Sequence, residues 1–202
     1  MKIYEYEGKT EEELILKALN ELNVKDDELL YKTKEVVTGL LKKKKVTLKV
    51  ILKTDVIEYA KEYLKQIVEG LGLEVQLETR REPNYISIKM NSNNNSILIG
   101  KNGKTLESIQ ILLRQSIFSQ TGIFVNIILN VENYKEKQER NIEFLAKKLA
   151  KEVLQTQIEI KMDSMNSYER RLVHEILKNY KGIKTESEGE EPNRCVVIKP
   201  SK

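Results

Sequence analysis

The stretch ILIGKNGKTLES, residues 97–108, places two glycines, a lysine and a threonine directly after an apolar run. Two kinds of glycine turn fit this order. One is the phosphate-binding loop of a nucleoside triphosphatase, and the other is a turn that holds the backbone of a nucleic acid. Only the first would make the chain a nucleotide-dependent enzyme, so the spacing of the glycines decides between two classes of protein.

The spacing disfavours the triphosphatase. The Walker A motif, G-x-x-x-x-G-K-[ST], would end here at Gly103, Lys104 and Thr105, and its first glycine would be residue 98, which is Leu98. The strand FVNIILN that follows ends in Asn130 and offers no aspartate for magnesium. Alternating strands around the motif also predict an antiparallel sheet, whereas such enzymes use a parallel one.

The remaining reading is a G-x-x-G turn between two helices, made by Gly100, Lys101, Asn102 and Gly103. Glycines three residues apart allow the main chain to approach a sugar-phosphate backbone without an intervening Cβ. The helix expected to start near Lys104 points amide N–H groups and its positive dipole end at a phosphate. A G-x-x-G alone is a weak signal, so its meaning depends on the elements around it.

Residues 53–132 predict the order helix, strand, strand, helix, helix, strand. Two segments, LEVQLET and YISIKM, alternate at the period of a strand, and Gly70 and Gly72 stop the helix before them. The polar run NSNNNS offers Asn and Ser side chains that can cap a short helix ending near Gly100. The first helix is indicated by apolar residues at helical spacing: Val56, Tyr59, Ala60, Tyr63, Leu64 and Ile67.

The regions on either side also mix helices with strands. Residues 1–52 read strand, helix, strand, strand, with Thr10 and Glu13 as a capping box. Residues 133–202 read as a long helix from Asn133, a strand, a second helix and a hairpin; the polar first half of the long helix suggests a bridge between domains. We therefore predict an α+β protein of three small domains, at residues 1–52, 53–132 and 133–202.

The second helix of the last region contains ERRLVHEILKNY, residues 169–180, with Arg170 and His174 one turn apart. A sole histidine is more often a satisfied boundary residue than a functional one. The sequence has no second histidine, no paired cysteines for a metal and no nucleophile turn, so neither catalysis nor a metal site is expected. No cofactor is expected either.

Composition sets wider bounds. The 202 residues carry 35 Lys+Arg against 31 Asp+Glu, a net charge of +4 that by itself does not identify a nucleic-acid binder. The single Cys195 excludes an internal disulfide framework and fits a reducing cytoplasm. No apolar run approaches the ~20 residues of a membrane span, and the first residues lack the apolar core of a signal peptide.

Residues 53–132, with ILIGKNGKTLESIQILL at 97–113, resemble the KH domain in its bacterial arrangement, as it occurs in the Jag (KhpB, SpoIIIJ-associated) family. The helix ERRLVHEILKNY followed by TESEGEEPNRCVVI resembles the R-x-x-x-H domain that closes Jag-family proteins. The N-terminal region is similar more loosely, with Gly39 kept and Lys42 where a second glycine often lies. One departure is Ser167, where the family often has proline.

This resemblance implies a non-catalytic protein that binds single-stranded RNA. The backbone would be held by Gly100, Lys101, Asn102, Gly103 and Lys104, with a second site at Arg170, His174 and Arg194. Three apolar residues are candidates for the base-binding groove or, equally, for plain core: Ile97, Ile99 and Ile109. Four glutamates, expected at a solvated hairpin tip, would repel the RNA: Glu186, Glu188, Glu190 and Glu191.

The resemblance also implies a cellular setting. Jag-family proteins are associated with a YidC-type membrane insertase and with control of cell elongation and envelope synthesis, and they pair with a separate small KH protein. A heterodimer or a homodimer in the cytoplasm is therefore expected. The chief alternative is an adaptor that uses its KH fold for protein contacts, with RNA binding incidental.

Overall fold

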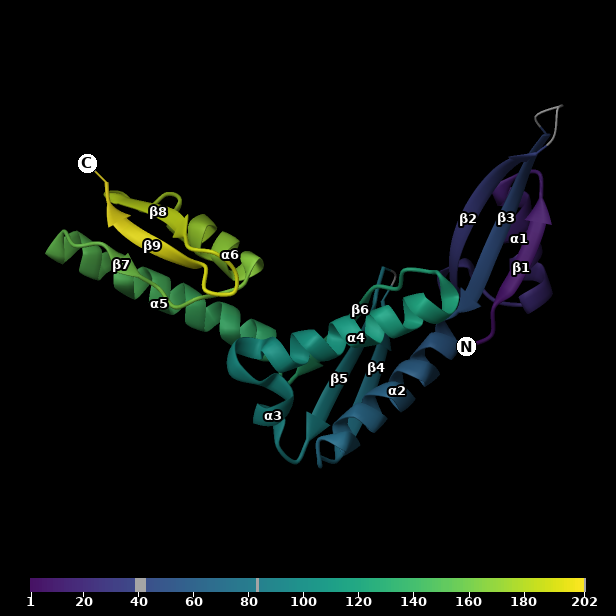
Figure 1. Cartoon of the computed structure of the whole chain (residues 1–202), viewed down its shortest axis with the longest axis horizontal. Helices are drawn as coiled ribbons and strands as arrows, with labels where there is room; N and C mark the ends of the chain where they lie inside the picture. Colours follow the sequence, from purple (N-terminus) through teal and green to yellow (C-terminus); the bar gives the residue numbers. More distant parts are fainter. Residues whose placement is uncertain (39–42, 83, 202) are drawn as a thin grey trace. The chain divides into compact units, whose positions relative to one another are not determined.

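The computed structural model describes residues 1–38, 43–82 and 84–201, and its labels are those of Figure 1. The chain forms two compact units, residues 1–132 and 133–202. Within the described residues the strands make three three-stranded sheets, two in the first unit and one in the second. Each unit thus combines helices with sheets, which confirms the predicted α+β class; the division of the first unit at residue 52 stays a prediction.

The first sheet has the strand order β1-β3-β2 and is antiparallel throughout, and α1 packs on it through Leu14 and Ala18. The predicted order strand, helix, strand, strand is confirmed. At the start of α1 the Glu13 amide donates to Oγ1 of Thr10 at 3.3 Å, as a capping residue should. Gly39 and Lys42 lie outside the described residues. The elements are β1 (Tyr4–Gly8), α1 (Glu11–Leu22), η1 (Asp26–Glu28), β2 (Leu29–Thr38) and β3 (Lys43–Leu52).

The second sheet has the order β4-β5-β6, with α2 and α4 packed against it. Alternate residues of β5 and β6 are buried, and so is one stripe of each long helix, so a single core lies between the helices and the sheet. The predicted helix-strand-strand-helix-helix-strand order is confirmed. The elements are α2 (Lys53–Gly70), β4 (Val75–Arg81), β5 (Ile86–Ser92), α3 (Asn95–Ile99), η2 (Lys101–Gly103), α4 (Lys104–Thr121) and β6 (Ile127–Val131).

The prediction of a wholly antiparallel sheet is wrong for one pair of strands. β4 and β5 are antiparallel, but β5 and β6 run parallel, with Ile86 opposite Ile127 and Met90 opposite Val131. The connection between β5 and β6 contains α3 and α4, and such a crossover returns the chain to the end of the sheet from which it left. Alternation of apolar residues reports which face is buried and not the direction of the strand.

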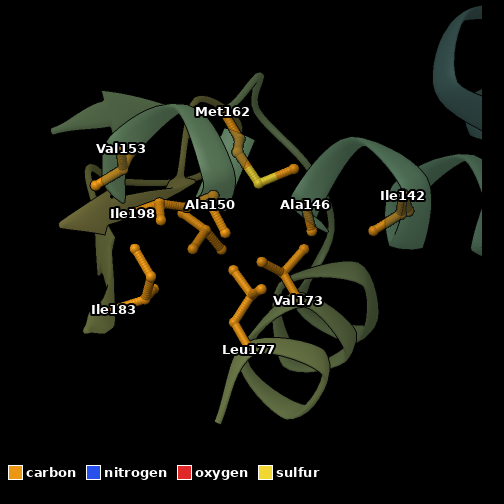
Figure 2. Close-up of a cluster of buried hydrophobic side chains, with 10 residues drawn as sticks. Ile142, Ala146, Ala150, Val153, Met162, Val173, Leu177, Ile183 and Ile198 are labelled. Carbon is orange, nitrogen blue, oxygen red and sulfur yellow. The ribbon is translucent and has the colours of Figure 1, made fainter. Parts of the chain in front are cut away.

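The second unit packs α5 and α6 against a sheet of order β7-β9-β8, in which β9 pairs antiparallel with both neighbours. Figure 2 shows the side chains that fill the space between the helices and the strands. The elements are α5 (Tyr134–Thr156), β7 (Ile160–Lys161), α6 (Ser167–Leu177), β8 (Ile183–Glu188) and β9 (Cys195–Pro200). The core consists of Ile142, Ala146, Ala150, Val153, Met162, Val173, Leu177, Ile183, Val196 and Ile198.

The helix α6 begins at Ser167 without a proline, because a capping box replaces it. Oδ1 of Asn166 accepts from the Glu169 amide at 3.0 Å, and Oε2 of Glu169 accepts from the Asn166 amide at 3.0 Å. The start of this helix fixes the position of the Arg170 and His174 side chains that follow it.

The polar first half of α5 also has a role within its own unit. Nε2 of Gln138 donates to Oε1 of Glu169 at 3.2 Å, and the Tyr168 hydroxyl donates to Oε1 of Glu139 at 2.8 Å. These bonds join α5 to α6 beyond the end of the apolar stripe. In the described ranges no helix is both long and apolar enough to span a membrane.

Candidate nucleic-acid interface

The glycine turn begins where α3 ends. Gly100 has φ 70° and ψ −178°, a conformation that is essentially restricted to glycine. A Cβ at this position would also clash with Oγ1 of Thr105, so the space beside Gly100 is already filled. Gly100 is therefore required by the shape of the turn, whatever the turn binds.

Asn102 and Gly103 complete the turn in the left-handed region, at φ 53° and φ 74°. Asparagine accepts this conformation better than most residues. Gly103 is the N-cap of α4 and provides no side chain to cap it. The Gly103 amide donates to the Gly100 carbonyl at 3.3 Å and the Lys104 amide donates to the Lys101 carbonyl, so these two amides are occupied within the turn. The helix dipole still gives this end of α4 a positive partial charge that favours an anion, although Glu107 in the first turn reduces the attraction.

The side chains at the tip of the turn face solvent. Lys101, Asn102 and Lys104 are all exposed. Gly100 is half-buried and Gly103 is buried, so the exposed tip combines two cations and a side-chain amide.

The apolar candidates beside the turn divide into two groups. Ile97 is 44% exposed and Ile99 is half-buried, so both present apolar surface next to the turn. Ile109 is 4% exposed and belongs to the core, which makes the plain core reading correct for this residue. Leu98 is fully buried.

The asparagines before α3 were predicted to cap this helix, but the structure shows a different contact. Asn94 is the N-cap but makes no side-chain cap bond. Instead Oδ1 of Asn95 accepts from the Ser92 amide at 2.7 Å, and its Nδ2 donates to Oε1 of Glu132 at 2.6 Å. Asn95 therefore anchors the helix that leads into Gly100 to the ends of β5 and β6.

Arg170, the arginine of the second predicted site, is largely enclosed at 8% exposure. Its Nη1 donates to the Met165 carbonyl and to Oε1 of Glu191, each at 2.8 Å. The Met165 amide in turn donates to the Arg194 carbonyl at 3.2 Å. Arg170 thus ties α6 to the segment that precedes β9, while the side chain of Arg194 is exposed.

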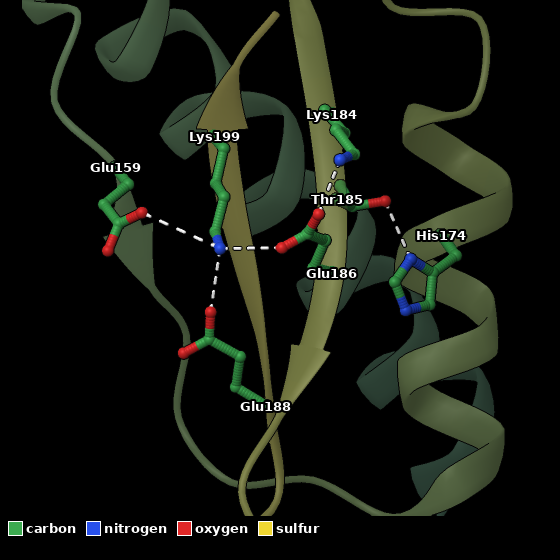
Figure 3. A network of polar contacts seen from close by, with 7 residues as sticks. All are labelled: Glu159, His174, Lys184, Thr185, Glu186, Glu188 and Lys199. Carbon is green, nitrogen blue, oxygen red and sulfur yellow. Dashed lines mark hydrogen bonds and ion pairs between the residues drawn. The ribbon is translucent and has the colours of Figure 1, made fainter.

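His174 is held on β8 through both ring nitrogens. Nδ1 lies 2.7 Å from Oγ1 of Thr185, and Nε2 lies 2.8 Å from Oγ of Ser187 (Figure 3 shows the first contact). Burial lowers the pKa of His174, and the nearby Arg170 guanidinium lowers it further. The ring is therefore neutral at pH 7 and acts by hydrogen bonding.

A shallow depression beside His174 is lined by three cations that are exposed to solvent: Arg171, Lys178 and Lys184. Glu175 is the one carboxylate among its lining residues. The fold assembles this group from α6 and β8, so Arg171 and Lys184 were not among the residues predicted from the sequence. In the sequence, only Lys178, one helical turn after His174, indicated part of this group of cations.

The expectation of a solvated acidic tip is wrong for Glu186 and Glu188, which lie within β8. Nζ of Lys199 lies 2.7 Å from Glu186 and 2.8 Å from Glu188, as Figure 3 shows. Glu186 also pairs with Lys184 at 2.6 Å. Hydrogen bonds from Lys184 and then Lys199 lower the pKa of Glu186 to about 2. These carboxylates are largely neutralised by the sheet itself and repel an approaching phosphate less than free ones would.

Across the residues that the structure describes, no group of three or more His, Cys, Asp and Glu side chains could hold a metal ion.

Two protein-family models match the chain, one in each compact unit. Residues 57–127 match the KH domain of KhpA/KhpB, and residues 140–200 match the R-x-x-x-H domain. The RNA-binding protein KhpB of Clostridium symbiosum is 34% identical over 199 residues, which cover 95% of this chain and 88% of the relative.

Two further relatives carry the same name, RNA-binding protein KhpB. That of Bacillus subtilis (strain 168) is 30% identical over 197 residues, which cover 95% of each chain. That of Lactiplantibacillus plantarum is 32% identical over 137 residues, which cover 68% of this chain and 42% of the relative. These matches extend over both units, and the chain belongs to the KhpB family, with a KH domain followed by an R-x-x-x-H domain.

Proposed function

We propose that the chain binds single-stranded RNA without catalysing a reaction, and that the glycine turn at residues 100–104 holds the RNA backbone. The observation that carries this proposal is the uncapped start of α4, which lies directly behind an exposed turn bearing Lys101, Asn102 and Lys104. The names of the curated relatives support RNA as the ligand.

In this proposal a phosphate lies beside the N-terminal end of α4, where the helix dipole favours negative charge. Lys101 and Lys104 neutralise neighbouring phosphates. Bases rest on the apolar surface of Ile97 and Ile99, and the site takes about four nucleotides, as KH domains do.

The second unit provides a further RNA contact in this proposal. Arg194 and the depression beside His174, with Arg171, Lys178 and Lys184, present the exposed cations. Arg170 acts chiefly by positioning α6 and the segment before β9, since its side chain is buried and bonded to Met165 and Glu191.

The cellular role we propose is the one associated with the family: regulation of cell elongation and envelope synthesis from the cytoplasm, close to a YidC-type insertase. A small KH protein or a second copy of the chain is the proposed partner. Ile111 and Leu112 favour such a contact, because they are 57% and 53% exposed on α4.

The same exposed residues favour the second candidate, an adaptor for which RNA is incidental. Salt dependence distinguishes the two. We expect the affinity of the full chain for a single-stranded RNA of about 20 nucleotides, followed by fluorescence anisotropy, to fall log-linearly with salt. Each phosphate contact contributes about 0.7 to the slope, so three to five contacts give a slope of about −2 to −3.5. Absence of RNA binding at about 50 mM salt would contradict the proposal.

A further inference from the structure

A groove runs between α5 and α6 in the second unit, away from the depression beside His174. Its floor is made by Leu172 and Ile176, which are half-buried and pack against the core of this unit. The side that belongs to α5 presents Glu136, Glu139, Arg140 and Glu143. The proposed RNA contacts use none of these residues.

The charge of this groove disfavours RNA as its occupant. Three carboxylates line it with one guanidinium. Lys147, outside the lining, pairs with Glu143 at 2.6 Å, so Glu136 and Glu139 are the carboxylates that keep the rim acidic. A phosphate backbone would be repelled here, whereas a cationic ligand would be attracted.

The geometry of the floor suits a helix. Leu172 and Ile176 are one turn apart on α6, which places their side chains about 5–6 Å from each other along the groove. An amphipathic helix that lies in a groove inserts apolar side chains at the same spacing. Tyr168, whose hydroxyl donates to Glu139 at 2.8 Å, is 60% exposed and adds apolar ring surface next to this rim.

One further apolar side chain of α5 is exposed close to the groove in the sequence, although it does not line the groove. Phe144 is 71% exposed and follows Glu143 directly. A phenylalanine this exposed adds to the apolar area that a partner would cover.

We propose that this groove binds a basic amphipathic helical segment of a partner protein. Two apolar side chains of that segment, one turn apart, pack on Leu172 and Ile176, and its lysine or arginine side chains pair with Glu136, Glu139 and Glu143. The groove is short, so the contact is weak and transient, of the kind found in regulatory encounters. The groove shares no residue with the glycine turn or with the depression beside His174.

The test uses the full chain and two synthetic peptides of about 15 residues, a length at which a helix can form. The first peptide carries leucines along one helical face and lysines on the other; the second has the same composition with its leucines spread around the helix. We expect the first peptide to shift the amide resonances of Glu136, Arg140, Glu143, Leu172 and Ile176, and the second to bind at least about tenfold more weakly.

Two double variants locate the site. Glu136→Gln with Glu143→Gln should weaken the first peptide about tenfold, since two ion pairs are removed. Glu62→Gln with Glu152→Gln, an equal charge change at exposed positions outside the groove, should not. The fold should be kept in both, because the Glu143–Lys147 pair lies at the surface.

Several results would overturn the proposal: resonance shifts centred outside the groove, equal weakening by the two double variants, equal binding of the two peptides, or no binding of the first. Light scattering would detect self-association of the chain. Self-association through these residues would assign the groove to a second copy of the chain and would also reject the proposal. RNA affinity should stay unchanged in Glu136→Gln with Glu143→Gln, so this test and the test of RNA binding can fail separately.

Discussion

Nη1 of Arg170 lies 2.8 Å from Oε1 of Glu191 and 2.8 Å from the Met165 carbonyl oxygen, so one nitrogen joins the first turn of α6 to two other segments. We therefore infer that the arginine of the R-x-x-x-H motif stabilises the second unit. Its neighbour Arg171, which is exposed beside the His174 depression, is better placed to meet a ligand.

We expect Arg170→Ala to destabilise the second unit by about 1–3 kcal/mol, because the Met165 carbonyl loses its charged donor in a largely enclosed place. Arg171→Ala is the matched control and should change stability by less than about 0.5 kcal/mol. Native-state hydrogen exchange of the Val173 and Val197 amides measures this unit alone. Equal effects of the two substitutions would contradict the structural role of Arg170.

The second RNA contact is tested with two RNA lengths. We expect Arg171→Ala with Arg194→Ala to weaken a long single strand and to leave a four-nucleotide RNA almost unaffected, because the short ligand fills only the glycine-turn site. The salt slope for the long strand should flatten by about 0.7 for each phosphate that the protein no longer neutralises.

The control for that test is Lys9→Ala with Lys61→Ala, which removes the same charge at exposed positions elsewhere. Equal weakening of short and long RNA would show that the second unit acts through the first site. No weakening of either would leave the cations around His174 as a solvated surface.

The order of elements could be predicted because it depends on local patterns. Leu14 and Ala18 at helical spacing, and β5 with its buried Ile86, Ile88 and Met90, report their structure within a few residues. The five residues from Gly100 to Lys104 could be grouped for the same reason, since they are contiguous in the chain.

The interactions that were missed all depend on residues far apart in the sequence. Arg170 and Glu191 are 21 residues apart, and Asn95 and Glu132 are 37 apart, so no local pattern reveals either pair. The parallel pairing of β5 and β6 arises in the same way, from a crossover and not from the strands themselves. Burial of Arg170 could not be anticipated, because an arginine on an amphipathic helix is usually exposed.

The ion pairs of β8 predict that the stability of the fold depends on pH. Glu186 has a pKa of about 2 in the folded chain against an ordinary value of 4.5, through Lys184 first and Lys199 second. A carboxyl group whose pKa is lower in the folded state stabilises the fold fully above its ordinary pKa, and this contribution is lost as the pH falls from about 4.5 towards 2.

We expect the carboxyl carbon resonance of Glu186 to titrate near pH 2, and Lys184→Met to raise its midpoint more than Lys61→Met, the same charge change at an exposed position elsewhere, does. A midpoint near 4.5 in the unsubstituted protein would show that the two lysines do not hold this carboxylate.

The glycine turn should not serve a nucleoside triphosphatase. We expect no ATP binding in the presence of magnesium by calorimetry and no hydrolysis, because Leu98 is a buried side chain where the Walker A motif requires glycine. ATP binding that Lys104→Ala abolishes would contradict this reading of the turn.

The central claim is that the turn at residues 100–104 holds RNA, and its most direct test is the affinity of Lys101→Asp with Asn102→Asp for single-stranded RNA. Both side chains are exposed, and aspartate accepts the left-handed conformation of residue 102, so the melting temperature should hardly change. The control, Lys61→Asp with Asn20→Asp, makes the same charge change at exposed helix positions. We expect the first variant to lose binding of a four-nucleotide RNA and the control to keep it; unchanged binding by the folded first variant would contradict the account.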